Sequence, residues 1–142
     1  MVKTSTEAAT ATEPGAGSPF PGYTDAAKAG SLRVRMDPQG FVDIDKACEE
    51  LIARLTRARD DARALGAQAT WGLGEQNPRL FSAVELVRLF RDKAFGGANN
   101  ANDTVEQYLA VAEDIRAMFH AACESYQRVD ADFAARLREI TA

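Results

Sequence analysis

The sequence predicts an all-α protein: an antiparallel two-helix hairpin with a short extra helix in the connection and a disordered N-terminal tail. Two long stretches support this prediction, because in each of them apolar and small residues keep the three- and four-residue steps of a helix. The third observation is a low-complexity segment that precedes both stretches. We therefore divide the 142 residues into a tail, residues 1–30, and a helical hairpin domain, residues 31–142.

The N-terminal tail has the composition of a segment without a packed core. It is rich in alanine, threonine, glycine and proline, and Pro14, Pro19 and Pro21 interrupt any regular helix. Such a segment buries too little apolar surface to offset the entropy lost on ordering, so we expect it to be disordered. Residues 31–36 alternate between apolar and charged side chains but have no partner strand, and we interpret them as an extended lead-in.

The first long helix is predicted over about residues 38–65. Asp37 is suited to cap it with its carboxylate, and Pro38 fits the first helical position, where no amide hydrogen is needed. Gly66 is suited to a left-handed C-terminal cap. The apolar seam of this helix, meaning the residues that recur along one face, is Phe41, Ile44, Cys48, Leu51, Leu55, Ala58, Ala62 and Leu65.

The connection between the long helices contains a turn and a short helix. Glycines predict the turn element, which consists of Trp71, Gly72 and Gly74. The short helix is predicted over about residues 82–95, because Ser82 can cap it and Glu85 can complete a capping box. We expect this helix to fold over the tip of the hairpin.

The second long helix is predicted over about residues 103–140, and Asp103 with Glu106 provides a capping box at its start. Its seam is Val105, Tyr108, Ala112, Ile115, Phe119, Ala122, Tyr126, Val129 and Phe133. Two helices alone bury little surface, so we expect a partner to cover the remaining apolar residues. The candidate partner interface is Val111, Met118, Val129 and Phe133.

Charge and hydropathy argue against two classes of partner. The formal net charge is −4 and the isoelectric point is about 5.0, which disfavours binding to nucleic-acid phosphates. No run of eighteen or more apolar residues is present, so we predict no membrane span. The first residues also lack the apolar region of a secretory signal peptide. We therefore expect the chain to be made in the cytoplasm, and to leave the cell, if it does, without a cleaved leader.

The titratable residues do not form a catalytic pattern. His120 is the only histidine, which excludes a two-histidine metal site within one chain. Acidic neighbours such as Asp43 and Asp45 do not converge on a substrate as paired catalytic carboxylates must. The sequence also lacks a glycine-rich phosphate loop. We predict that the protein is not an enzyme and that it uses no metal and no cofactor.

The two cysteines leave two interpretations open. Free cysteines are often small buried helix residues, which is the simpler interpretation of Cys48 and Cys123. If Leu65 lies opposite Val105 in the hairpin, however, Cys48 lies opposite Ala122 and next to Cys123. A disulfide between the helices is then geometrically conceivable, although a reducing cytosol disfavours it.

A tyrosine and an aspartate lie four positions apart near the end of the second long helix, at Tyr126 and Asp130. In a small, acidic, alanine-rich helical protein this pattern resembles the export signal of ESX (type VII) secretion substrates. With the capped first helix and the turn element, residues 33–140 resemble the Trp-X-Gly superfamily of these substrates, and more closely its EspC-like branch in actinobacteria. The chain departs from the family pattern at Leu73, which stands in the third position of the turn, and its connection is longer than the family's tight turn.

The resemblance implies a helical hairpin that pairs with another hairpin into a four-helix bundle and is exported folded. It also implies that the secretion machinery reads Tyr126 and Asp130, and that Trp71 lies beside the tail element of the partner. The implied function is that of a non-catalytic type VII secretion substrate, or of a helper that carries a larger effector, within a homodimer or heterodimer. Such a protein is made in the cytoplasm and is then secreted or held at the cell envelope.

An alternative function is a cytoplasmic helical adaptor or immunity-type binding protein that is never exported. The position of the tyrosine and the aspartate distinguishes the two functions. Residues four apart on a helix lie on one face, so an export signal requires Tyr126 and Asp130 to face solvent together. The adaptor is favoured if Tyr126 is buried in the seam and Asp130 is merely solvated.

Overall fold

The computed structural model describes residues 21–32 and 35–142, and within these residues the chain is helical and contains no strand. The predicted all-α class is therefore confirmed. The helices, in chain order, are α1 (Pro21–Lys28), α2 (Pro38–Ala67), α3 (Phe81–Ala94), α4 (Ala101–Val129) and α5 (Ala131–Thr141).

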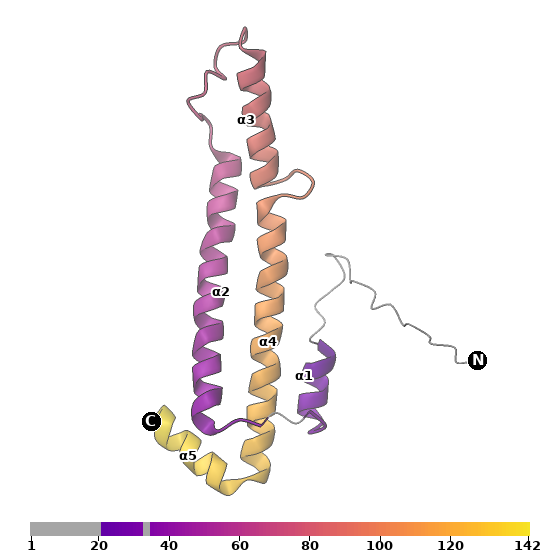
Figure 1. Ribbon diagram of the computed structural model, residues 1–142, viewed down its shortest axis with the longest axis vertical. Coiled ribbons are helices and arrows are strands. Elements are labelled where there is room, and N and C mark those ends of the chain that lie inside the picture. The colour runs from indigo at the N-terminus through magenta and orange to yellow at the C-terminus, as the bar shows by residue number, and fades with distance from the viewer. Residues whose placement is uncertain (1–20, 33–34) are drawn as a thin grey trace, which may run out of the picture.

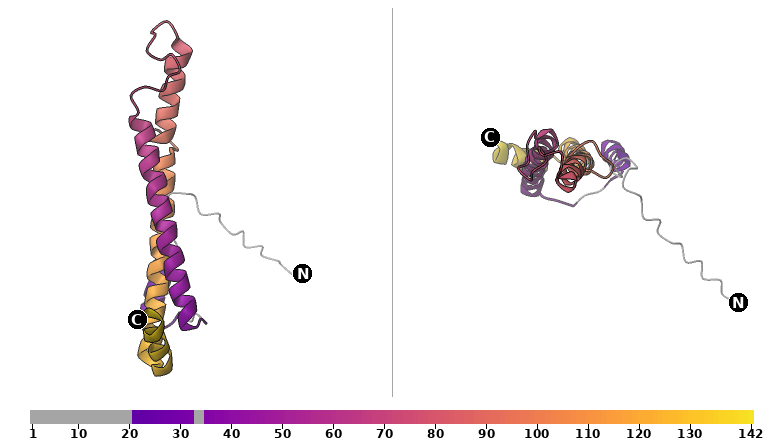
Figure 2. Two further views of the ribbon diagram at one scale, coloured as in Figure 1. Left: turned by 90° about the vertical axis from the view of Figure 1, so that its left-hand side faces the viewer. Right: turned by 90° about the horizontal axis from the view of Figure 1, so that it is seen from above.

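The helices form a layer that is one helix thick. The long helices α2 and α4 run side by side in opposite directions, with α1 along the lower half of α4 and α5 at the foot of α2 (Figure 1). Seen from above, α5, α2, α4 and α1 lie roughly in a row (Figure 2). Domains usually bury their apolar faces between two layers. Among the described helices, no second layer covers either broad face of the α2–α4 pair.

Helix α2 begins as the sequence predicts and ends differently. The carboxylate of Asp37 accepts a hydrogen bond of 2.7 Å from the backbone N–H of Gly40, and Pro38 occupies the first helical position. The predicted left-handed cap at Gly66 is wrong, because the helix continues to Ala67. A Cβ atom at Gly66 would lie 2.7 Å from the Cβ atom of Phe95. This glycine therefore allows the close approach of the end of α3 to α2.

Helix α3 is formed by nearly the residues for which a short helix was predicted. It lacks the predicted cap, and it packs at a different place in the fold. It begins after Leu80 with no side-chain capping bond. The capping box of Ser82 and Glu85 is therefore wrong, and the Glu85 carboxylate pairs with Arg88 instead. The helix does not fold over the tip of the hairpin. It continues roughly in line with α4 and extends beyond the end of α2 (Figure 1).

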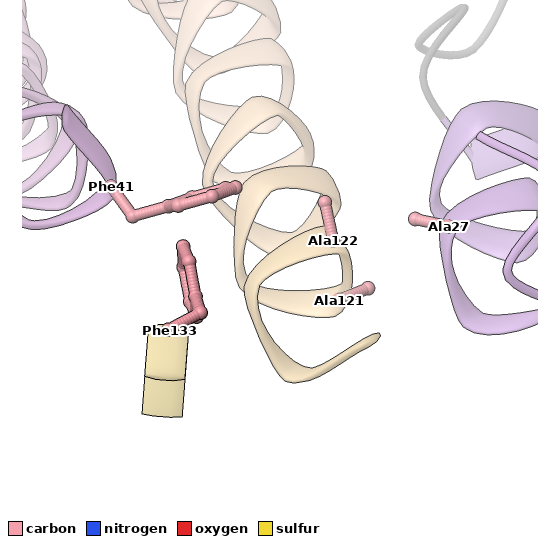
Figure 3. Packing of buried hydrophobic residues seen from close by; sticks show 5 residues of the cluster. All are labelled: Ala27, Phe41, Ala121, Ala122 and Phe133. Carbon is pink, nitrogen blue, oxygen red and sulfur yellow. The ribbon is translucent and has the colours of Figure 1, made fainter. Parts of the chain in front are cut away.

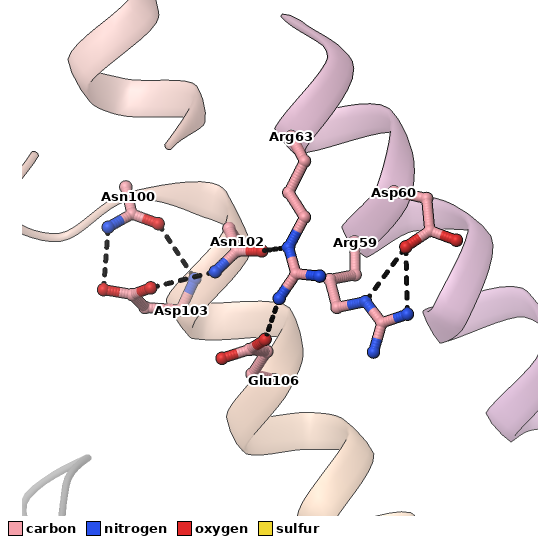
Figure 4. A network of polar contacts seen from close by, with 7 residues as sticks. All are labelled: Arg59, Asp60, Arg63, Asn100, Asn102, Asp103 and Glu106. Atoms are coloured by element: carbon pink, nitrogen blue, oxygen red, sulfur yellow. Dashed lines mark hydrogen bonds and ion pairs between the residues drawn. The ribbon is translucent and has the colours of Figure 1, made fainter. Parts of the chain in front are cut away.

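Helix α4 begins earlier than predicted because a buried asparagine caps it. The side-chain oxygen of Asn100 accepts a hydrogen bond of 2.9 Å from the backbone N–H of Asp103. The Asn100 amide group donates to the Asp103 carboxylate (Figure 4) and also to the carbonyl of Gly97. The predicted capping box of Asp103 and Glu106 is therefore wrong. Glu106 contacts Arg63 of α2 instead.

The predicted continuous helix over residues 103–140 is wrong, because the chain breaks at Asp130. This residue has an extended backbone, with φ −132° and ψ 103°, and its carboxylate accepts a hydrogen bond of 2.9 Å from the backbone N–H of Phe133. It thereby caps α5, which turns back beside α2 (Figure 1). Capping by an aspartate satisfies amide hydrogens that a helix start leaves free, so a single residue suffices to separate the two helices.

The predicted disordered tail is wrong for residues 21–28, which form α1, and residues 1–20 lie outside the described part of the chain. Pro21 stands at the first position of α1, where proline is well tolerated. Ala27 is fully buried in a cluster with Ala121 and Ala122 of α4 (Figure 3). Small side chains let the two helices approach closely, so alanine residues that resemble low-complexity sequence build a packed contact here.

The main core lies at the foot of the hairpin, where α1, α2, α4 and α5 meet. The ring of Phe41 packs edge-on against that of Phe133, with centroids 5.7 Å apart (Figure 3). Phe119 and Tyr126 of α4 flank this pair, at 6.4 and 5.9 Å from the Phe41 ring. Offset and edge-to-face aromatic pairs add to the stabilisation from burial. The core thus fixes α5 against both long helices.

Candidate interaction surfaces

Two sets of polar contacts fix how α2 and α4 face each other. Near the foot, the Arg116 guanidinium donates to the Asp45 carboxylate at 2.6 Å and also pairs with Glu49, while His120 contacts the same Asp45. The hydrogen bond from Arg116 is the main reason why the pKa of Asp45 lies below its usual value, and Asp45 in turn raises the pKa of Arg116.

The second set joins the other end of α2 to the start of α4. The Arg63 guanidinium donates at 2.8 Å to the side-chain oxygen of Asn102 and also pairs with Glu106 (Figure 4). Asn102 is buried, and its amide nitrogen donates to the Asp103 carboxylate. Hydrogen bonds to charged groups are stronger than those between neutral groups. These contacts therefore determine which turns of the two helices lie opposite each other.

The register set by these contacts separates the two cysteines. Glu49 pairs with Arg116 and Arg63 with Asn102, and residues further along α2 face earlier residues of α4, so Cys48 lies opposite about residue 117, on the order of six residues or about 9 Å from Cys123 along the helix axis. The assumed register of Leu65 opposite Val105 is therefore wrong by roughly one helical turn. Both cysteines are free. Cys48 is buried, and its desolvation raises the pKa of its thiol.

Only part of the predicted seam of α2 faces α4. Phe41, Cys48 and Ala62 are buried, whereas Leu51 and Leu65 remain 47% and 44% exposed. The seam residues that lie away from α4 recur at every seventh position, and a spacing of seven keeps side chains on nearly the same face of a helix. We call these residues the α2 stripe, which consists of Ile44, Leu51, Ala58 and Leu65.

Helix α4 carries a matching set of apolar residues outside its contact with α2. Tyr108 is 60% exposed, and the other members are half-buried. We call this set the α4 stripe, which consists of Tyr108, Val111, Ile115 and Met118. Helical periodicity in an antiparallel pair puts the two stripes on the same broad side of the layer. The expected interface residues Val111 and Met118 belong to this stripe.

The other two expected interface residues, Val129 and Phe133, differ in how exposed their side chains are. Val129 is 81% exposed at the end of α4. Phe133 is only 3% exposed, because it packs against Phe41 and Tyr126 in the core at the foot. Its assignment to a partner interface is therefore wrong for this conformation.

A further apolar surface on α3 was missed by the sequence analysis. Phe81 is 77% exposed, and Leu86, Leu89 and Phe90 are also exposed. This helix has apolar residues around much of its circumference, while only Ala83, Val87 and Ala94 are buried. A helix that is apolar on several sides is usually covered on several sides. That pattern is the signal that could have identified the surface.

Tyr126 and Asp130 do not lie on one face of a straight helix. Tyr126 is half-buried, and its ring lies 5.2 Å from that of Phe133 and 5.9 Å from that of Phe41. The carboxylate of Asp130 is exposed and caps α5. The structure therefore places the tyrosine against the core and the aspartate at the break between two helices.

The turn element is a compact local structure at the other end of the hairpin. The carboxylate of Glu75 accepts hydrogen bonds from the backbone N–H groups of Trp71, Gly72 and Leu73, and these bonds, that of Trp71 first, lower the pKa of Glu75. Gly72 and Gly74 have left-handed φ values of 75° and 92°, which favour glycine. The turn presents the Trp71 ring to α3.

The Trp71 side chain packs within this chain. Its ring lies 5.6 Å from that of Phe90, and its Nε1 atom is buried with no hydrogen-bond partner among the described residues. The three residues of the predicted turn element thus do lie together, but they hold the tryptophan against α3.

Within residues 21–32 and 35–142, we find a shallow recess but no site typical of a metalloenzyme. The recess has a volume of about 300 Å³ between α2, α4 and α5, with Phe41, Phe119 and Leu137 in its walls and Asp45 and His120 among its polar lining. In this part of the chain, no three His, Cys, Asp or Glu side chains come together as metal ligands would. None of the described helices combines the length and the hydropathy of a membrane span.

Comparison of the chain with known protein families, with curated proteins and with solved structures gives no match.

Proposed function

We propose that this chain is a non-catalytic binding protein that pairs with another helical hairpin along the α2 and α4 stripes. The observation that carries the proposal is the exposure of Leu51, Leu65 and Tyr108 on one side of a layer that is one helix thick. Exposed apolar residues aligned along two helices are typical of a surface that a partner covers. A second pair of helices on this side would complete a four-helix bundle.

The cellular role that we propose is that of a type VII secretion substrate, or of a helper that carries a larger effector to the secretion machinery. The support is the pair Tyr126 and Asp130 in the last part of a helical hairpin, with the Asp130 carboxylate open to solvent. In this role the protein is made in the cytoplasm and is then secreted or held at the cell envelope, and its partners are a second hairpin, a larger effector or the machinery itself.

The second candidate role is a cytoplasmic adaptor or immunity-type protein that uses the same stripes but is not exported. The packing of Tyr126 against Phe41 and Phe133 favours it, because a half-buried tyrosine has a structural reason to be present without any signal. In both roles the stripes bind a partner helix. The roles differ in whether another protein recognises residues 126–130.

Export of tagged protein from a host with a type VII system distinguishes the two roles. We expect the parent in the culture filtrate and the variants Tyr126→Ala and Asp130→Asn in the lysate. Asparagine keeps the capping oxygen at the start of α5 but removes the charge, so its effect reports on recognition more than on folding. A known substrate of the same system serves as the positive control.

The matched control for the tyrosine is Phe119→Ala. It also removes a half-buried ring from the surroundings of Phe41 but leaves residues 126–130 intact. At equal folded abundance, we expect this control to be exported. Retention of Phe119→Ala together with Tyr126→Ala would attribute the loss to packing. If the parent stays inside while the known substrate is exported, the secretion role is wrong and the adaptor role remains.

A further inference from the structure

Helix α5 covers residues that would otherwise extend the α4 stripe. Phe133 of α5 lies over Tyr126, with ring centroids 5.2 Å apart and planes 30° from parallel. Leu137, the next apolar residue on this side of α5, packs against the same core. The turned-back position of α5 therefore buries Phe133 and covers one side of Tyr126, whose ring also lies 5.9 Å from that of Phe41 in α2.

The break between α4 and α5 involves one residue and no helix-breaking side chain. Residues 126–136 contain neither glycine nor proline. The backbone N–H of Asp130 still donates to the carbonyl of Tyr126 at 2.9 Å, as in a helix. The N–H of Phe133, which would donate to the Val129 carbonyl in a continuous helix, donates to the Asp130 carboxylate instead.

The sequence on both sides of the break keeps the spacing of a single helix. In a straight helix, Tyr126, Phe133 and Ile140 would recur every seven residues on one face, as an extension of the α4 stripe. Asp130, four residues after Tyr126, would then share that face with it. Arg128 and Asp132 would also come into pairing distance, since they are four residues apart.

We propose that α5 is a latch with two positions. In the closed position, seen here, α5 covers Tyr126. In the open position, α4 and α5 form one helix that presents Tyr126, Asp130 and Phe133 to the amphipathic helix of the partner hairpin. The occupant is the partner of the α2 and α4 stripes, because the newly exposed face lies on the same side of α4 as the α4 stripe, beyond Ala122, which packs with Ala27 of α1. This inference rests on the proposed pairing function. It adds that the position of α5 controls whether the C-terminal part of the interface is accessible to the partner.

Two substitutions shift the latch in opposite directions. Ala131→Pro locks it closed, because Ala131 is the first residue of α5, where proline fits, and proline there would clash within a continuous helix. The residue before a proline also prefers the extended backbone that Asp130 already has. Asp130→Ala opens it, because alanine removes the cap of α5 and favours a helical backbone. We expect the open population to rise about fivefold, the usual effect of losing a cap.

The distance between spin labels at Lys46 of α2 and Glu139 of α5 measures the position of the latch. Both side chains are exposed, and the native thiols are replaced by Cys48→Ala and Cys123→Ser. Opening lengthens the distance by more than about 15 Å, because α5 then points away from α2. Far-ultraviolet circular dichroism reports whether the opened segment stays helical.

We expect a mainly short distance in the parent, an added long distance in Asp130→Ala at equal or higher helix content, and only the short distance in Ala131→Pro. A single short distance in all three proteins would overturn the latch. A long distance with reduced helix content in Asp130→Ala would also overturn it, because α5 would then have unfolded. Glu139→Ala, measured by circular dichroism, controls for the loss of one acidic residue in this region.

The export assay separates this inference from the proposed function. Leu137→Gln is a second opening variant that leaves Tyr126 and Asp130 unchanged. We expect Ala131→Pro to be retained in the cell and Leu137→Gln to be exported. If export needs Tyr126 but Ala131→Pro leaves at the level of the parent, the latch does not control recognition, and only this inference fails. If the distances shift as expected and the parent is not exported, the secretion role fails while the latch stands.

Discussion

At the scale of single residues, Asp45 links the two long helices through polar contacts that lie outside the predicted seam. Its carboxylate accepts from Arg116 and contacts His120, so one side chain of α2 holds two successive turns of α4. The exposed fractions of the Asp45 and Arg116 side chains are 34% and 31%, so water still screens the pair. Its contribution to stability is therefore that of a partly exposed ion pair.

Asp45→Asn is expected to lower the free energy of unfolding by a few tenths to about 1 kcal/mol at neutral pH. Because the folded protein holds the pKa of Asp45 below 3.8, the unfolded chain binds this proton more readily. The stabilisation is therefore present above that ordinary pKa and is lost as the pH falls through the lowered one. Urea denaturation of both proteins from neutral to acidic pH measures it.

Glu50→Gln is the control for that measurement, since Glu50 is an exposed acid on the same helix. The difference between parent and Asp45→Asn should shrink towards acidic pH, whereas the difference for Glu50→Gln should stay small throughout. A difference for Asp45→Asn that does not change with pH would show that its charge does not stabilise the fold.

At the scale of elements, the starts of α4 and α5 show how capping decides where helices begin. Asn100 is 1% exposed and satisfies donors and acceptors on both sides of the turn before α4. Asp130 caps α5 from an exposed position, because its carboxylate accepts a hydrogen bond from the backbone N–H of Phe133. At α4 the capping residue differs from the predicted Asp103, and at α5 the sequence predicted no helix start, because neighbouring candidates are nearly equivalent until packing selects one of them.

Asn100→Ala is expected to lower the free energy of unfolding by about 1–3 kcal/mol. The substitution removes the cap of α4 and leaves the partly buried carbonyl of Gly97 without its amide donor. Chemical denaturation followed by circular dichroism measures the change. Asn99→Gly is the matched control, because Asn99 is exposed and has a left-handed φ of 53°, which glycine adopts without strain. Equal losses in both variants would contradict a capping role for Asn100.

At the scale of the whole molecule, a layer one helix thick explains the exposed apolar residues. In a two-layer fold the α2 stripe and the α4 stripe would be covered from within the chain. Here the additional helices α1 and α5 lie at the edges of the layer (Figure 2), and Leu51, Leu65 and Tyr108 of the stripes remain exposed. The broad side that carries the stripes therefore remains available to another molecule.

The double variant Leu51→Gln/Leu65→Gln is expected to lose association while keeping its fold. We expect sedimentation of the parent to show a mass that rises with protein concentration, because the two stripes can pair with those of a second copy. The double variant should sediment as a monomer. The free energy of unfolding of its monomer should change by about 0.5 kcal/mol or less per site, because both side chains are largely exposed.

Leu89→Gln provides the control for association, since Leu89 is an equally exposed leucine on α3, outside both stripes. It should associate as the parent does. A parent that is monomeric at every concentration would contradict pairing between copies, and association that depends on Leu89 instead would assign the interface to α3.

The sequence by itself determined the all-helical class, the start of α2 at Asp37 and Pro38, and the residues that form the short helix α3. These features depend on neighbours a few residues apart, and local propensity and heptad spacing describe such neighbours well. The spacing also identified Phe41 and Cys48 as seam residues, which are buried. The spacing does not distinguish these buried residues from Leu51 and Leu65 of the same seam, which are exposed to solvent.

Only the tertiary structure decided that α1 packs on α4, that the chain breaks at Asp130, and that Phe133 turns back onto Phe41. A heptad pattern states which residues share a face of one helix, but not which other helix covers that face. The break occurs because capping and the burial of Phe133 together outweigh the continuation of α4. Such a balance depends on a contact between residues some ninety positions apart, which no local pattern records.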